Sequence, residues 1–129
     1  MTDRDPQIQR LSIRFTGANR AMVLIGIARR WSYVDVGPEL VRVRLSWGFA
    51  VDVPRHTVRS AVADHDAVWG WGAHGWRGVW LVNGSSSGIV RIDLSTPARG
   101  RVAFLPVRVV ALRVAMDDPE GLIAALAAS

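Results

Sequence analysis

The stretch Leu40-Val41-Arg42-Val43-Arg44-Leu45 alternates between apolar and charged side chains. Successive side chains of a strand point to opposite faces, so this pattern predicts a β-strand with its valines on a buried face and its arginines on a solvated one. The segments on either side, 32–36 and 49–53, also have strand composition, and turn residues separate them from it. The three segments predict consecutive strands of an antiparallel sheet.

The rest of the chain predicts more short strands and two regions of different character. Residues 20–28 are largely apolar, and their pattern leaves open a short helix or a buried strand; Asn19 as a cap favours the helix. Near the C-terminus, Asp117-Asp118-Pro119-Glu120 has the composition of a helix start, and Asp117 and Glu120 have the spacing of a capping box. Strands are expected at residues 8–15, 57–62, 79–82, 89–94, 101–105 and 107–116, the last two separated near Pro106.

These elements predict a mainly β fold. We expect a partly open barrel or roll of about seven antiparallel strands, capped by a short C-terminal helix. The length of 129 residues fits a single domain, residues 1–129, with residues 1–6 as a flexible polar tail. The longest apolar stretch, 21–28, is too short to span a bilayer, and the first residues lack the order of a secretory signal. A cytoplasmic location is therefore expected.

The charged residues and the absence of cysteine restrict the chemistry. The chain has no cysteine, which excludes disulfides, thiolate metal ligands and a cysteine nucleophile. All 16 basic residues are arginines, and the net charge is +5. The absence of lysine excludes a Schiff base and a P-loop lysine. A positive balance of this size attracts phosphate groups or an anionic membrane face.

Several segments together resemble a known kind of protein. They are 32–36, 41–44, 49–54, Gly70-Trp71-Gly72 with Gly75-Trp76-Arg77-Gly78, Leu81-Val82-Asn83-Gly84-Ser85, and 114–126. In this order they resemble small actinobacterial proteins of unknown function that are similar to bacterial pleckstrin-homology (PH)-like domains, over residues 30–128. The resemblance implies two roughly perpendicular sheets that form a partly open barrel, with one end plugged by the C-terminal helix. It implies no activity, and it does not imply phosphoinositide binding.

Apparent enzyme motifs do not have the context that their chemistry needs. Gly70-Trp71-Gly72-Ala73-His74-Gly75 matches a dinucleotide-binding pattern, but no helix can begin within it. Gly84-Ser85-Ser86-Ser87-Gly88 matches a nucleophile elbow, but a strand follows it and every histidine precedes it. His65 between Asp64 and Asp66 has no metal-ligand spacing, since neighbours on a strand face opposite ways. We therefore expect no enzyme activity, no cofactor and no metal.

A segment rich in tryptophan and glycine is the first candidate binding site. Residues 64–88 contain four of the six tryptophans. Such rings stack on a flat ligand, insert at a membrane surface or anchor a partner; the alternative is that they fill the core at the mouth of the barrel. Arg42 and Arg44 form a second candidate, a basic stripe, although arginine on the wet face of a strand is also ordinary. The candidates in the segment are Trp69, Trp71, Trp76, Arg77 and Trp80.

The sequence thus favours a non-enzymatic PH-like binding or scaffold module with a protein partner. One alternative is a peripheral membrane or lipid-binding module that uses the tryptophan- and glycine-rich segment and the positive charge. A second alternative is a carrier of a small apolar ligand. Nucleic acid is not the expected partner, and the sequence leaves the oligomeric state open.

Overall fold

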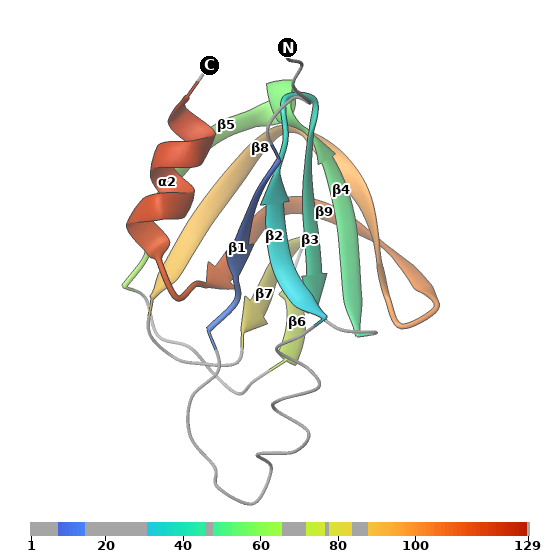
Figure 1. Ribbon diagram of the computed structural model, residues 1–129. Helices are drawn as coiled ribbons and strands as arrows, with labels where there is room; N and C mark the ends of the chain where they lie inside the picture. The colour runs from blue at the N-terminus through green and yellow to red at the C-terminus, as the bar shows by residue number, and fades with distance from the viewer. Residues whose placement is uncertain are drawn as a thin grey trace, which may run out of the picture.

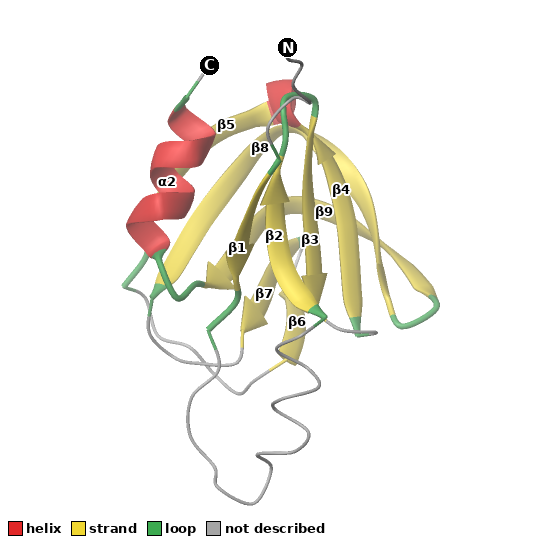
Figure 2. Cartoon of the chain, viewed as in Figure 1, coloured by secondary structure: helices red, strands yellow, loops and turns green. Residues whose placement is uncertain are grey.

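The protein folds as one curled β-sheet with a C-terminal helix beside it (Figures 1 and 2). The computed structural model describes residues 8–14, 31–45, 48–65, 72–76, 78–83 and 88–128. Within these ranges the elements are β1 (Gln9–Ser12), β2 (Ser32–Val36), β3 (Leu40–Leu45), β4 (Phe49–Pro54), the 3-10 turn η2 (Arg55–Thr57), β5 (Val58–Ala63), β6 (Gly72–Trp76), β7 (Val79–Asn83), β8 (Ile89–Val102), β9 (Leu105–Ala115) and α2 (Pro119–Ala127).

The sheet curls because two strands, β4 and β5, pair along the same edge of its longest strand, β8. The strand order is β1-β2-β3-β4-β8-β9-β7-β6, and β5 also pairs with β8. The first half of β8 pairs with β5 and its last residues pair with β4. An isolated bridge joins Ile13, just after β1, to Met116, just after β9. Two backbone bonds flank it, from Arg14 N to the Ala115 oxygen (2.8 Å) and from Asp117 N to the Ser12 oxygen (3.1 Å). The two sides of the curl therefore meet, and the sheet forms a partly open barrel.

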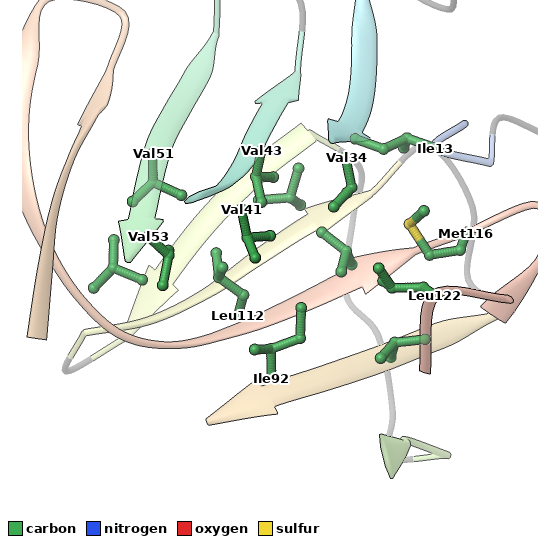
Figure 3. Packing of buried hydrophobic residues seen from close by; sticks show 14 of the residues in the cluster. Ile13, Val34, Val41, Val43, Val51, Val53, Ile92, Leu112, Met116 and Leu122 are labelled. Atoms are coloured by element: carbon green, nitrogen blue, oxygen red, sulfur yellow. The ribbon is translucent and has the colours of Figure 1, made fainter. Parts of the chain in front are cut away.

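The core lies inside this curl. The alternating side chains of β2, β3 and β4 face those of β8, β9 and α2, as Figure 3 shows. Gly100 on β8 allows a close approach to β4, since a Cβ atom there would lie 2.9 Å from the Ala50 oxygen and 3.1 Å from the Val51 Cβ. Fully buried members of the core include Ile13, Val34, Val43, Phe49, Ile92, Leu112, Met116 and Leu122.

Helix α2 covers the opening between β5 and β1 (Figure 2). Asp118 begins the helix: its carboxylate accepts a bond from Gly121 N (3.0 Å), and Pro119 occupies the first turn. Leu122 is fully buried against the barrel. Arg55 holds the other end of the helix, because its guanidinium donates to the carbonyls of Gly37 (3.0 Å), Ala125 (2.8 Å) and Ala128.

The mainly β, partly open barrel with a short C-terminal helix is confirmed. The details differ from the sequence prediction in four places. Within the described ranges the sheet has nine strands, and β7 pairs with β9 in parallel. The segments 89–94 and 101–105 belong to one strand up to Val102, and the turn lies at Ala103 and Phe104, not near Pro106. Asp118, not Asp117, is the helix cap.

The tryptophan- and glycine-rich segment also differs from its prediction, because it contributes the strand β6. Two other expectations, the tail at residues 1–6 and the helix or strand at 20–28, lie outside the described residues.

Candidate functional site

The structure places only some of the predicted tryptophan site. Trp69, Trp71 and Arg77 lie outside the described residues. Trp76 is the last residue of β6 and pairs with Val79 of β7. Of the five candidates in this segment, Trp80 is therefore the one whose side chain the structure describes.

Trp80 is a packing residue at the edge of the core. Its ring centroid lies 5.7 Å from that of Phe49 at a tilt of 34°, an ordinary geometry for an aromatic pair. Its indole Nε1 donates to the carbonyl of Arg108 (3.1 Å). The ring joins β7 to the core, and its N–H joins β7 to the backbone of β9. Trp80 thus fits the core alternative that the sequence left open.

The second candidate, Arg42 and Arg44, belongs to a larger basic surface. Residues directly opposite one another in a sheet share a face. Arg44 lies opposite Ala50, Ala50 lies opposite Arg101, and Arg101 lies opposite Pro106. A single row therefore crosses β3, β4, β8 and β9 on the outer face of the barrel, with an arginine on β3 and another on β8.

A second row lies beside the first. Arg99 precedes Arg101 by two residues, so the two side chains leave β8 on the same face. Arg99 lies opposite Arg108 of β9, and Arg42 lies opposite Asp52 of β4. We call Arg42, Arg44, Arg99, Arg101 and Arg108 the basic face.

Most of this positive charge is not neutralised by described carboxylates. Arg44 pairs with Asp52 (2.8 Å), and Arg101 donates to the carbonyl of Ala103 (3.3 Å). Among the residues that the structure describes, Arg99 and Arg108 have no acidic partner within ion-pair distance, and Arg42 makes no ion pair although it lies between Asp35 and Asp52 on the neighbouring strands. The basic face therefore has a positive charge that can attract an anionic group.

A shallow hollow lies within the basic face. It has a volume of about 210 Å³ and is lined by the side chains or backbone of Arg44, Ala50, Val51, Asp52, Arg99, Gly100 and Arg101. Gly100 contributes only backbone to this lining, since a Cβ there would point into the core toward Val51 and Val109. The hollow is open to solvent and large enough for a phosphate group.

The β8–β9 hairpin extends from the same strands as the basic face. In Figure 1 its turn lies beyond β4, on the side of the barrel away from α2. At the turn, Phe104 is 93% exposed and Leu105 is 67% exposed. We call these two residues the hairpin tip. Ala103 holds the turn beside β4 through a bond from its N–H to the carbonyl of Gly48 (3.0 Å).

The other arginine clusters differ from the basic face because they are paired. Arg10 makes two bonds to the carboxylate of Asp35 (2.7 and 2.8 Å) and lies 3.8 Å from the centre of the Tyr33 ring. The hydrogen bonds that Arg10 donates to Asp35 raise the pKa of the Arg10 guanidinium. Arg113 pairs with Asp64 at 2.7 Å, with both side chains mostly buried. These arginines already have anionic partners within the chain.

The sequence reasoning did not identify most of this surface. It named Arg42 and Arg44 but not Arg99, Arg101 and Arg108. The signals were present: Arg99-Gly100-Arg101 alternates as a strand does, and Phe104-Leu105 is an apolar pair beside Ala103. A strand break at Pro106, as expected from the sequence, places Phe104 inside a strand. The sequence alone therefore does not place the Phe104-Leu105 pair at a turn.

Comparison of the chain with models of protein families, with curated proteins and with solved structures finds no match. In the part of the chain that the structure describes, no helix is long and apolar enough to cross a membrane. The basic face and the hairpin tip are therefore interpreted from their own geometry.

Proposed function

We propose that this protein is a non-enzymatic, PH-like binding module whose basic face receives an anionic partner. The observation that carries the proposal is the gathering of Arg99, Arg101 and Arg108 on one outer face without acidic ion-pair partners among the described residues. Uncompensated like charges on one face repel one another, and an anionic ligand relieves that repulsion.

The partners of the described aspartates support a binding role over a catalytic one. Each of these aspartates is held by an arginine, by a hydroxyl and an arginine, or by a helix N-terminus, whereas the two described glutamates, Glu39 and Glu120, make no ion pair with a described residue; the aspartates are Asp35, Asp52, Asp64, Asp93, Asp117 and Asp118. A general acid or base has to exchange its proton with a substrate, which such pairing opposes.

The barrel and its terminal helix support the PH-like part of the proposal, together with the segments quoted from the sequence. An acidic protein and an anionic membrane both carry the charge that the basic face requires. A cytoplasmic location, with the protein peripheral to the membrane, belongs to the same proposal.

Retention on immobilised heparin tests the basic face as an anion-binding surface. Arg99→Ser and Arg108→Ser each remove one charge from the face, and Arg59→Ser removes one from exposed β5 as a matched control. We expect the first two variants to elute at lower salt than the control, because local charge density governs polyanion binding. Identical elution of all three variants would show that only net charge matters, and the proposed site would be wrong.

A further inference from the structure

We propose that the β8–β9 hairpin docks on an anionic lipid bilayer, with the hairpin tip in the apolar boundary and the basic face against the lipid phosphates. The inference rests on the proposed function, and it names the anionic partner as a membrane surface. It uses Phe104 and Leu105, which are not part of the tryptophan- and glycine-rich segment.

The hairpin tip provides an apolar anchor. Phe104 and Leu105 are adjacent, and both are among the most exposed large apolar side chains of the described residues. They lie at the turn of the hairpin, beyond β4 on the side of the barrel away from α2 (Figure 1). Water solvates such side chains unfavourably, and a bilayer removes them from it.

Arg101 lies at headgroup depth behind this anchor, and Arg99 and Arg108 lie farther back. The last residue pair before the turn is Val102–Leu105. Arg101 lies one residue farther from the turn, and the Arg99–Arg108 pair lies two residues farther still. At about 3.3 Å per residue, the arginines lie roughly 7 to 13 Å behind the turn. The headgroup layer of one leaflet is about 5–8 Å thick. With the tip at the hydrocarbon boundary, Arg101 reaches the phosphates, whereas Arg99 and Arg108 lie just outside the headgroup layer, within a Debye length of it.

The combination of the two features favours a bilayer over other anionic partners. A reversible lipid-surface contact needs two signals, an apolar anchor and a basic patch, and the hairpin has both. Nucleic acid would use the arginines, but it presents its phosphates without an apolar layer beyond them. An acidic protein would bury a broad patch centred on apolar residues, whereas here the apolar pair lies at one end of the basic surface.

The absence of cysteine permits a direct test of insertion. A single cysteine is introduced as Phe104→Cys and labelled with an environment-sensitive fluorophore. Val62→Cys is the matched control, since Val62 is an exposed apolar residue on β5, far from the hairpin in the sheet. Vesicles of phosphatidylcholine with phosphatidylserine are compared with vesicles of phosphatidylcholine alone. We expect a blue shift at position 104 with the anionic vesicles only, and none at position 62.

Unlabelled variants separate the two signals in vesicle co-sedimentation. We expect Phe104→Ser to lower the partition coefficient about tenfold, and Val62→Ser to leave it unchanged. Arg101→Ser should lower it about fivefold at low salt, Arg99→Ser and Arg108→Ser each by less than that, and Arg59→Ser least. Added salt should weaken the arginine effects more than the Phe104 effect.

The outcomes separate this inference from the proposed function. If heparin retention depends on the basic face while vesicles fail to bind at low salt, the anion-binding function stands and the membrane inference is wrong. If vesicles bind but Phe104→Ser changes nothing and position 104 shows no blue shift, the tip does not insert and the inference is again wrong. If neither heparin nor vesicles distinguish Arg99→Ser from Arg59→Ser, both proposals fail.

Discussion

At the scale of single residues, exposure determines what an ion pair contributes. The Arg113 and Asp64 side chains are 15% and 7% exposed, whereas Arg10 is 60% exposed above an Asp35 side chain that is itself 10% exposed, so the two pairs differ in the burial of the arginine. Removing Arg113 leaves a carboxylate that water reaches poorly. Removing Arg10 exposes Asp35, which already lines a surface hollow, so water replaces the lost partner. The two pairs have the same length, 2.7 Å, but unequal effects on stability are expected.

We predict that Arg113→Met lowers the free energy of unfolding by about 3 kcal/mol, and that Arg10→Met lowers it by about 1 kcal/mol. Urea unfolding measures both. The double variant Arg113→Met with Asp64→Leu is the control, because removing both charges of a buried pair restores much of the loss. Equal losses in the two single variants would contradict the role assigned to burial.

The backbone of Ala103 supports a second prediction at this scale. Its φ is +53°, in the left-handed region that favours glycine. Ala103→Gly removes the conflict between Cβ and the backbone and keeps the N–H bond to Gly48, so we expect stability to rise by up to about 1 kcal/mol. Ala50→Gly, in the regular strand β4, should instead lower it by roughly 0.5–1 kcal/mol. A loss of stability with Ala103→Gly in urea unfolding would refute this interpretation.

At the scale of elements, the long strand β8 shows where sequence prediction succeeds and where it stops. Its first part alternates clearly, and residues 89–94 were predicted as a strand. Ser95, Thr96 and Pro97 resemble a loop, yet the strand continues through them because the pairing with β9 shifts register between Asp93 and Ala98. A bulge tolerates proline, since it leaves a backbone position without a ladder bond. No local pattern distinguishes such a bulge from a break.

The candidate site shows the same limit. The alternation of Arg42 and Arg44 with valines predicted their shared face correctly. Their proximity to Arg101 depends on β4 pairing with β8, a contact between segments about fifty residues apart that no local pattern specifies. Sequence reasoning therefore recovered one strand of the basic face but not the neighbouring strands that complete it.

The start of helix α2 can be tested with two adjacent aspartates. Asp118 accepts a bond from Gly121 N, whereas Asp117 lies 3.8 Å from Arg14 and is largely exposed. Asp118→Ala should therefore lower the free energy of unfolding by about 1 kcal/mol, and Asp117→Ala by about half of that or less. Chemical denaturation measures both variants. A larger loss for Asp117→Ala would restore the capping box predicted from the sequence.

At the scale of the whole molecule, one core connects the barrel to the helix. Leu122 of α2 belongs to the same buried cluster as Val34 of β2 and Leu112 of β9. Because the helix completes this cluster, it should not unfold separately from the sheet. Cooperative unfolding of a small domain requires this kind of shared core.

Leu122→Ala tests this cooperativity. Deleting a fully buried leucine should lower the free energy of unfolding by about 3 kcal/mol, through lost burial and the cavity that remains. The transitions followed by far-ultraviolet circular dichroism and by tryptophan fluorescence should move to lower urea together. Ala124→Ser, at an exposed position of the same helix, should change stability by less than about 0.5 kcal/mol. If the two transitions separate in Leu122→Ala, the helix is an independent unit, and the barrel persists without it.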